Sequence, residues 1–325
     1  MSARLIVMGS LNMDLSVTVP RLPQPGETMP GADVVRAPGG KGANQAIAAA
    51  RLGADVKMIG LLGADAFGDE LRARLVAEGV DDRGVSTVAG VASGLALIVV
   101  QDDGENTITL SPGANRHVDA RCLARLTAPG AIRSGDTVLL QLEVPVDTVL
   151  AAARAAREAG ALTVLNAAPL PTAPLPAELL RTVDVLVVNE TEAAGLLPPA
   201  QKTAPTHDII GDLPAGDQWL THAERLRSLG PGTVVITLGA SGAVAAGQTQ
   251  QVRVPAFDVE AVDTVGAGDA FSAQLALDLG RREPLPRALR RACAAGALAT
   301  TRRGAQDALP TRAEVAHLLE AVHAG

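Results

Sequence analysis

The chain has 325 residues, 47% of them hydrophobic, so it is long enough to bury a substantial core. Its 28 basic and 35 acidic residues leave a net charge of −7, which argues against nucleic acid as a partner. Two cysteines without C-x-x-C spacing argue against a disulfide framework, and five scattered histidines argue against a zinc site.

The start of the chain has no targeting signal that we can identify. The apolar run before residue 9 is shorter than the core of a signal peptide, and it breaks at a Gly-Ser-Leu-Asn sequence. No other apolar run approaches the roughly 18 residues of a membrane span. We therefore expect a cytoplasmic protein without a membrane partner.

Short apolar runs alternate with Ala-rich helical stretches along the chain. The strands are predicted at residues 5–8, 56–61, 137–142, 162–165, 183–188 and 233–237. Helices are predicted at 42–52, 69–78, 146–159, 191–197 and 217–229. Strands that are apolar throughout are typical of parallel strands covered on both faces. The pattern predicts an α/β fold with a doubly wound, mostly parallel sheet flanked by helices.

Two strand pairs interrupt this alternation. Residues 15–19 with 32–35, and 95–101 with 107–110, are joined by turns rather than by helices. We interpret them as a small antiparallel sheet beside the main one; an edge extension of the main sheet is the alternative. We expect one domain over residues 1–325, with the strands of the second sheet inserted from about 12–37 and 94–112.

Two further segments have no predicted role in chemistry. Residues 198–216 contain four prolines and are expected to form a surface loop. Near the end of the chain, Thr311 and Glu314 have the spacing of a capping box, which predicts a final helix.

The strongest chemical signal is the string Asp263-Thr264-Val265-Gly266-Ala267-Gly268-Asp269 before a helical stretch. A small-residue turn that opens a helix presents free backbone N–H groups to an anion such as a phosphoryl group. A carboxylate beside that anion would repel it, so its presence there indicates a chemical role. Accepting a proton from an attacking alcohol is such a role. We therefore predict Asp269 as a general base, and a glycine-rich turn capped by an Asp is the structural alternative.

Other known phosphate-binding motifs do not match. Gly40-Lys41 is followed by Gly42 rather than Ser or Thr, so it is not a Walker A motif, and no G-x-G-x-x-G follows a strand.

A second glycine-rich string, Pro38 to Ala46, also runs into a helix. Its Lys41 and Asn44 suit a polyhydroxylated ligand, because an Asn side chain offers both a donor and an acceptor. Taken alone, the string is equally compatible with a simple turn before a helix.

Polar residues follow several predicted strands, at the edge where α/β proteins bind ligands. They are Asn12 and Asp14 after the first strand, Glu143, the group Asn189-Glu190-Thr191-Glu192, and the stretch Thr237 to Gly242. Acidic residues at such ends bind hydroxyl groups or Mg²⁺, but many only cap the next helix.

These strings, in this order, resemble the ribokinase family of carbohydrate kinases over nearly the whole chain. Within it, residues 25–28, 141–143, 189–192 and 303–306 fit the subgroup that phosphorylates free ribose. The resemblance implies ATP-dependent phosphorylation of the 5-hydroxyl of D-ribose. It also implies that the small sheet is a lid over the sugar and the interface of a homodimer.

The resemblance assigns roles to individual residues. It implies sugar contacts from Asn12, Asp14, Gly40, Lys41, Asn44 and Glu143, with Asp269 as the base. It implies ATP binding by Asn189, Thr237, Gly239, Gly242 and Gly268, with Glu192 near Mg²⁺. The amides of Gly266, Ala267 and Gly268 would form an anion hole. An activating K⁺ would lie at Asp263, Val265, Ala299, Arg302 and Gly304.

Two positions depart from the family pattern. Ala308 stands where a Ser commonly helps to complete the K⁺ shell, which leaves the strength of K⁺ activation open. Cys293 stands where an Asn often meets the adenine. Three other functions stay open: a kinase for another free sugar, a kinase for a nucleoside, and a sugar-binding regulator without catalysis.

Overall fold

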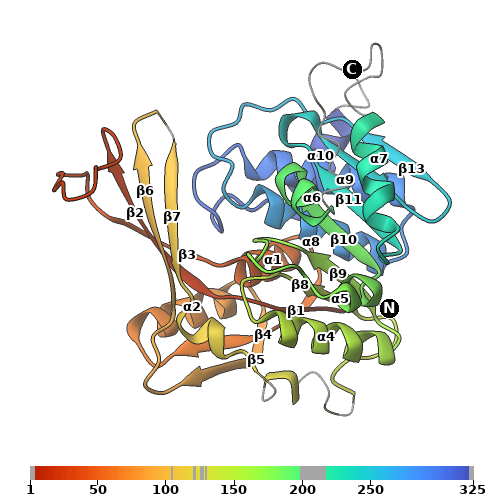
Figure 1. The fold of residues 1–325 in the computed structure, drawn as a ribbon, viewed down its shortest axis with the longest axis horizontal. Coiled ribbons are helices and arrows are strands. Elements are labelled where there is room, and N and C mark those ends of the chain that lie inside the picture. Colours follow the sequence, from red (N-terminus) through yellow and green to blue (C-terminus); the bar gives the residue numbers. More distant parts are fainter. Residues whose placement is uncertain are drawn as a thin grey trace.

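The computed structural model describes residues 4–321, apart from 104, 120–121, 125–127, 129 and 198–216. The predicted Pro-rich loop therefore lies outside the described residues. A nine-stranded sheet runs through the molecule with helices on both faces, and a four-stranded sheet projects from one side (Figure 1). The predicted α/β class and the second sheet are confirmed.

The main sheet contains every strand predicted for it and three that were not predicted. Its spatial order is β13 (Gln251–Val254), β12 (Ala243–Ala246), β11 (Thr233–Thr237), β10 (Val185–Asn189), β9 (Leu162–Asn166), β8 (Thr137–Leu140), β1 (Arg4–Met8), β4 (Asp55–Gly63) and β5 (Asp81–Val88). All neighbours are parallel except β11 with β12 and β12 with β13. Of the three additional strands, β5 and β13 are the two edges of the sheet, and β12 lies next to β13.

Helices cover both faces of this sheet. One face packs against α1 (Lys41–Arg51), α2 (Ala66–Ala77), α8 (Ala267–Gly280), α9 (Leu285–Ala299) and α10 (Arg312–Ala321). The other packs against α4 (Val146–Glu158), α5 (Ala177–Thr182), α6 (Glu190–Leu196) and α7 (Asp217–Arg227). The final helix begins after the predicted capping box, in which the Glu314 carboxylate accepts from the Thr311 backbone N–H. Among the described residues, no helix is long and apolar enough to cross a membrane.

The main sheet separates two hydrophobic cores, one on each of its faces, and each central strand contributes side chains to both. Val185 and Val187 of β10 lie in the core beneath α1 and α8, whereas Leu186 and Val188 lie in the core beneath α4 to α7. A strand with alternate residues in two cores must be apolar throughout, as the sequence pattern predicts.

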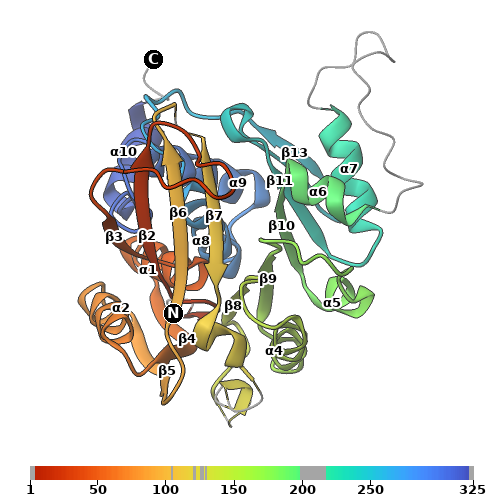
Figure 2. The same ribbon diagram turned by 60° about the vertical axis from the view of Figure 1, so that its left-hand side comes forward.

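The second sheet has the order β3 (Val35–Gly39), β2 (Asn12–Val19), β6 (Gly94–Gln101) and β7 (Asn106–Ser111), and is called here the small sheet. Its two outer pairs are antiparallel, as predicted, but the central pair of β2 and β6 is parallel. Because β2 and β6 are the first strands of two separate hairpins that leave the body side by side, they point the same way (Figure 2). The small sheet is therefore mixed rather than wholly antiparallel, and it is not an extension of the main sheet.

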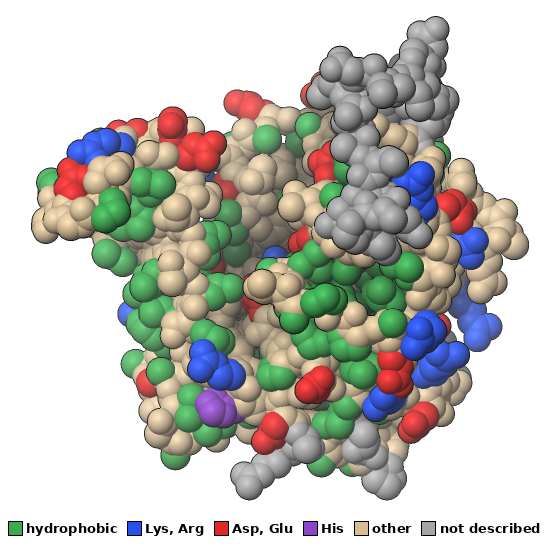
Figure 3. Space-filling view, in the orientation of Figure 1, with side chains coloured by type: hydrophobic (Ala, Val, Ile, Leu, Met, Phe, Trp, Pro, Cys, Tyr) green, Lys and Arg blue, Asp and Glu red, His purple; other side chains and the backbone are tan. Residues whose placement is uncertain are grey.

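The order of the main sheet reverses around β1. From β1 the chain passes first to β4 on one side and later returns to β8 on the other. In open α/β sheets, ligands bind at such a reversal, beyond the carboxyl ends of the strands. The molecule is hollowed between the small sheet and the body, with charged side chains on the floor of the hollow (Figure 3).

Candidate active site

The predicted base lies at the start of α8, inside the protein. Asp269 is 6% exposed and belongs to the first turn of the helix, whose N-cap is Gly266. Gly266 has a φ of 80°, and a Cβ atom there would lie 2.9 Å from the carbonyl oxygen of Ala305. A glycine is therefore needed at this turn for the backbone alone.

The same turn leaves backbone N–H groups free for an anion. The Ala267 N–H makes only a long bond of 3.3 Å to the Thr264 carbonyl. Those of Gly266, Gly268 and Asp269 have no acceptor among the described residues. A Cβ added to Gly268 would meet no atom within 4 Å, so nothing within the described protein requires a glycine there. Free N–H groups beside open space at a helix start are the features of an anion site.

Two neighbouring amides from α1 bind the Asp269 carboxylate. Asn44 donates from Nδ2 to Oδ2 over 2.9 Å, and Gln45 donates from Nε2 to Oδ1 over 2.9 Å. The Asn44 oxygen accepts from Gln306. The two glycine-rich strings thus meet at one carboxylate.

The start of α1 packs directly on the loop after β1, which explains its glycines. A Cβ atom at Gly40 would lie 2.7 Å from the Asn12 nitrogen, and one at Gly42 would lie 2.6 Å from the Ser10 nitrogen. Gly40 also has a φ of 87°. The close approach brings Lys41 and Asn44 to the carboxyl end of β1.

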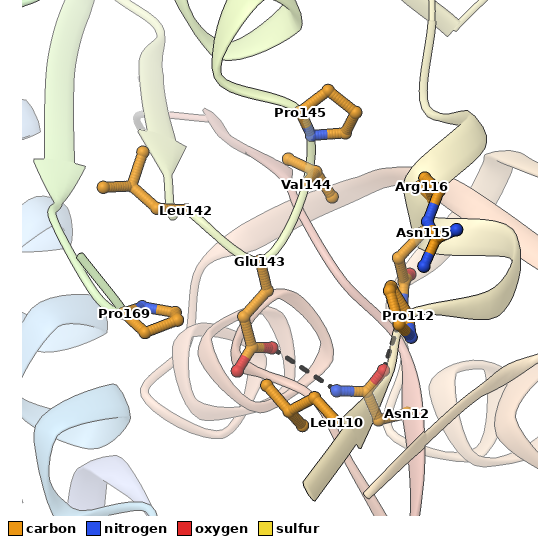
Figure 4. A pocket seen from close by; sticks show the side chains of 10 residues that line it. All are labelled: Asn12, Leu110, Pro112, Asn115, Arg116, Leu142, Glu143, Val144, Pro145 and Pro169. Carbon is orange, nitrogen blue, oxygen red and sulfur yellow. Dashed lines mark hydrogen bonds between the residues drawn. The ribbon is translucent and has the colours of Figure 1, made fainter. Parts of the chain in front are cut away.

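Glu143, which follows β8, is held beside this end of β1. Its Oε2 accepts from the Ser10 hydroxyl at 2.5 Å and from the Lys41 backbone N–H at 3.1 Å. Asn12 lies between Asn115 and Glu143, donating to the carboxylate at 3.5 Å and accepting from Asn115 at 2.7 Å (Figure 4). The side chains of Asn12, Asn115 and Glu143 all line a cavity of about 290 Å³.

Carboxylates outnumber cations in this region. Burial, together with repulsion from Glu143 and Asp269, raises the pKa of Asp14 to about 7. Burial acts to lower the pKa of Lys41, but attraction to Asp269, Glu143 and Glu192 outweighs it, and the pKa is raised. Asp14 has no hydrogen-bond partner among the described residues, so its carboxylate is free to accept one from a ligand.

The acidic group after β10 forms a helix cap. Asn189 and Glu192 make a reciprocal capping box at the start of α6, with both bonds at 2.8 Å. Burial is the main cause that raises the pKa of Glu192. The capping bond uses Oε2 of Glu192, and Oε1 has no partner among the described residues.

Three of the predicted nucleotide residues, Thr237, Gly239 and Gly242, lie at the end of β11 and in the turn that leads to β12. Thr237 ends β11, and Gly239 begins a short 3-10 turn with a φ of 51° and open space around it. Gly242 has a φ of 90°, and a Cβ atom there would lie 2.6 Å from the Ala256 nitrogen. Gly242 is thus required by the fold, whereas Gly239 faces open space.

Two of the predicted K⁺ residues, Val265 and Gly304, contact Asp263. Its carboxylate accepts from the backbone N–H groups of Val265 at 3.0 Å and Gly304 at 2.9 Å, joining the turn before α8 to the segment after α9. Ala299 is the last residue of α9. The Arg302 side chain bonds the Ala308 carbonyl at 3.2 Å, so Arg302 contributes at most its backbone.

Several polar residues of the site had no predicted role. Ser10, Gln45, Gln141 and Gln306 belong to strings that were singled out, but none was assigned a contact. The sequence carries no signal for Asn115 and Asn166, because a single Asn beside a turn or at the end of a strand is too common to be informative.

Comparisons with known proteins identify the family of this chain. Residues 2–312 match the model of the pfkB family of carbohydrate kinases. The ribokinase of Haemophilus influenzae is 36% identical, covering 98% of this chain and 99% of that protein. The ribokinase of Bacillus subtilis is 38% identical, covering 96% and 98%, respectively. The structure of Arabidopsis thaliana ribokinase complexed with ribose and ATP is 31% identical, with a TM-score of 0.84 and coverage of 98% and 99%. The resemblance and the enzyme class inferred from the sequence are confirmed: the chain belongs to the pfkB family of carbohydrate kinases.

Proposed function

We propose that this chain is a ribokinase, which transfers the γ-phosphoryl group of ATP to the 5-hydroxyl of D-ribose. The observation that carries the proposal is the buried Asp269 carboxylate, held by Asn44 beside the free N–H groups of α8. A base and an anion site in contact are what phosphoryl transfer to an alcohol requires. The full-length ribokinase relatives support ribose as the acceptor.

The sugar would lie between the small sheet and the carboxyl ends of β1 and β8. Among the residues that the structure describes, the Asp14 carboxylate and the Oε1 atom of Glu143 have no partner, while the Oε2 atom of Glu143 is held. Asn12, with its oxygen committed to Asn115, presents its N–H group on the side of Glu143. Gly40 and Lys41 close the site from the start of α1. These groups would bind and orient the sugar hydroxyls.

The chemical step would depend on positioning and charge, because the transition state of phosphoryl transfer is loose. Asp269 would accept the proton of the attacking hydroxyl, and Asn44 would contact both the sugar and the base. The N–H groups of Gly266, Ala267 and Gly268 would stabilise the negative charge of the transferred group. Asn189, Thr237, Gly239 and Gly242 would line the rest of the nucleotide site.

The residues around Glu192 fit a role near Mg²⁺. Mg²⁺ in kinases is bound by substrate phosphates, water and one or two carboxylates. Glu192 has one oxygen in the capping box and one without a partner in the described part of the chain, so it can offer one such ligand, directly or through water. When bound, Mg²⁺ would offset the phosphate charge.

The turn around Asp263 fits a monovalent cation. K⁺ prefers oxygen ligands, and Asp263 joins the two segments that carry the carbonyls of Val265, Ala299, Arg302 and Gly304. When bound there, K⁺ would offset the Asp263 charge near the anion site.

The small sheet would close over the sugar and form a homodimer. Val35, Ile98 and Ile108 lie in one cross-strand row of this sheet, and Val35 and Ile108 are 61% and 57% exposed. Such apolar exposure is typical of an interface. Light scattering should give a dimer mass for the wild type and a monomer mass for Ile108→Lys; a wild-type monomer would refute the assembly.

A coupled assay for ADP release tests the activity. D-ribose should give the highest kcat/KM in a panel that also contains 2-deoxyribose, other free sugars and nucleosides. A higher value for one of the others would replace ribose as the substrate. No release with any acceptor would indicate a sugar-binding regulator.

A further inference from the structure

A chain of buried amides lies behind Asp269, away from the ligand positions proposed above. Gln45 and Gln141 are fully buried, and Asn166 is 8% exposed. They come from α1, from the residue after β8 and from the end of β9. Three separate segments of the core thus bring their side-chain amides to one point.

Gln45 uses both ends of its amide in this chain. Its Nε2 donates to Oδ1 of Asp269 at 2.9 Å and to Oδ1 of Asn166 at 3.0 Å. Its Oε1 accepts from Nε2 of Gln141 at 2.5 Å. Both N–H groups are used, so the reversed amide would place an oxygen against two acceptors and an NH₂ group against a donor. Only one orientation of Gln45 satisfies its neighbours.

The burial of Gln45 separates its role from that of Asn44. Asn44 is 5% exposed and binds the other carboxylate oxygen, whereas Gln45 is 0% exposed and cannot reach a ligand from its position. Any effect of Gln45 on the reaction must pass through Asp269. We propose that Gln45 is a positioning residue for phosphoryl transfer, which holds the Asp269 carboxylate in one orientation while Gln141 and Asn166 hold Gln45. The inference rests on the proposed role of Asp269 as the base.

Two effects follow from the bond between Gln45 and Asp269. First, it fixes the plane of the carboxylate, so that the Oδ2 side faces Asn44 and the site. Second, it stabilises the ionised carboxylate, because a buried oxygen without a donor loses the hydration that it had in water. Without Gln45, this oxygen would lose its donor, and the reaction should need a higher pH to reach its full rate.

Two other charged groups interact with Asp269: Asp14 from β2 and Lys41 from α1. Glu143 interacts with both of these groups, and Glu192 interacts with Lys41. All of them remain in variants of Gln45, so a difference from the wild type reports on Gln45. Asp14 titrates near neutral pH itself, and its effect is followed separately through the pH dependence of ribose binding.

The test is the pH profile of kcat at saturating ribose and ATP. The variants are Gln45→Leu, Gln45→Glu and Gln141→Leu, and the matched control is Gln274→Leu. Gln274 is also a buried glutamine that donates to an Asp carboxylate: it lies in the middle of α8, and its acceptor at 2.8 Å is Asp278, near the end of that helix. Gln45→Leu should lower kcat by about 10- to 100-fold and move the acidic limb upward by about one pH unit.

Other variants give graded expectations. Gln45→Glu should move the limb further, because two adjacent carboxyl groups share a proton. Gln141→Leu should move it less, because Gln45 keeps its bond to Asp269 but loses its fixed orientation. The KM values and the pH dependence of ribose binding should change little in all three. Gln274→Leu should keep the wild-type profile even where its melting temperature falls.

The outcomes are decisive in both directions. A shifted limb in the folded variants, with a wild-type limb in Gln274→Leu, supports the inference. If one variant does not fold, the acidic limb of the kcat profile in the other variants is the test. An unshifted acidic limb in a folded variant of Gln45 or Gln141 overturns the inference. Asp269→Asn is measured in parallel: if it keeps its kcat, the proposed base is wrong, and if it loses kcat while the limb of the Gln45 variants stays in place, only the present inference is wrong.

Discussion

The Asn44 side chain donates to the Asp269 carboxylate across 2.9 Å, although 225 residues separate the two in the chain. Each residue lies near the start of a helix that opens with glycines, and α1 and α8 pack side by side on one face of the main sheet. The two strings that are most informative in the sequence are therefore two sides of one site. The sugar and phosphate roles that we propose for them require this contact.

The first prediction concerns the base. Asp269→Asn keeps the shape of the side chain but removes its ability to accept a proton, so kcat should fall by roughly 10² or more. ATP and ribose should still bind with nearly unchanged affinity, as measured by calorimetry. A variant that keeps more than about a tenth of the wild-type kcat would exclude Asp269 as the base.

The second prediction compares two glycines of the same turn. Gly268→Ala meets no atom within 4 Å and should leave the melting temperature unchanged or raise it slightly, because Ala favours a helix over Gly by up to about 1 kcal/mol. Its methyl group would occupy the space proposed for the phosphoryl group, so kcat/KM for ATP should fall by about tenfold or more. Gly266→Ala should instead destabilise the protein by roughly 1–3 kcal/mol, because its φ is 80°.

Thermal unfolding and steady-state kinetics of both variants check these expectations. The pair serves as its own control, since the two residues are one position apart. Wild-type kinetics in Gly268→Ala would remove the anion hole from this turn.

The third prediction concerns Asp14, whose pKa is raised to about 7 from its ordinary value of 3.8. An acid with a raised pKa binds protons more tightly when folded, so stability falls as pH rises through this window. Asp14→Asn should therefore raise the free energy of unfolding at pH 8, by about 1–2 kcal/mol after allowance for partial exposure. The gain should shrink as pH falls below 7, as measured by urea unfolding at several pH values.

The same substitution should weaken ribose binding by about ten- to a hundredfold, because sugar hydroxyls lose a charged acceptor. ATP affinity should stay constant. Ribose binding to the wild type should weaken as pH falls through about 7. Equal losses for ribose and ATP would contradict the assignment of Asp14 to the sugar.

The sequence predicts those parts of the fold that depend on local pattern. The strands of the interior, such as β10, are apolar throughout because two cores bury them. The pattern does not predict β5, because it is an edge strand that begins with Asp81, Asp82 and Arg83. β12 is buried, but it has only four residues, and three of them are Ala, which is depleted in strands.

The parallel pairing of β2 with β6 was also beyond local prediction. Each hairpin is visible in the sequence by itself, but their relative direction depends on where both leave the main sheet.

The site shows the same division. Helix starts with several glycines stand out in a sequence, so the sequence predicts Gly40, Lys41 and Asp269 as residues of the site. Gln141 and Asn166 lie near the ends of β8 and β9, and their meeting at Gln45 depends on strand order, which no local pattern contains.

The last prediction concerns K⁺. Activity measured against KCl at constant ionic strength, with tetramethylammonium as the balancing cation, should rise with K⁺ and less with Na⁺ or Li⁺. Ala308 is buried and its side chain has no oxygen, while its carbonyl accepts from Arg302 at 3.2 Å. The shell proposed around Asp263 therefore lacks a ligand from this residue, and the K⁺ concentration for half-activation should be high.

Restoring a hydroxyl with Ala308→Ser should lower that concentration without changing kcat at saturating K⁺. Asp263→Asn tests the charge: it keeps an acceptor oxygen for only one of the two N–H groups, those of Val265 and Gly304, and it removes the attraction for a cation. Its rate should respond less to KCl than that of the wild type. A flat KCl profile in the wild type would leave Asp263 only the role visible in its two hydrogen bonds, which is to fasten the turn before α8 to the segment after α9.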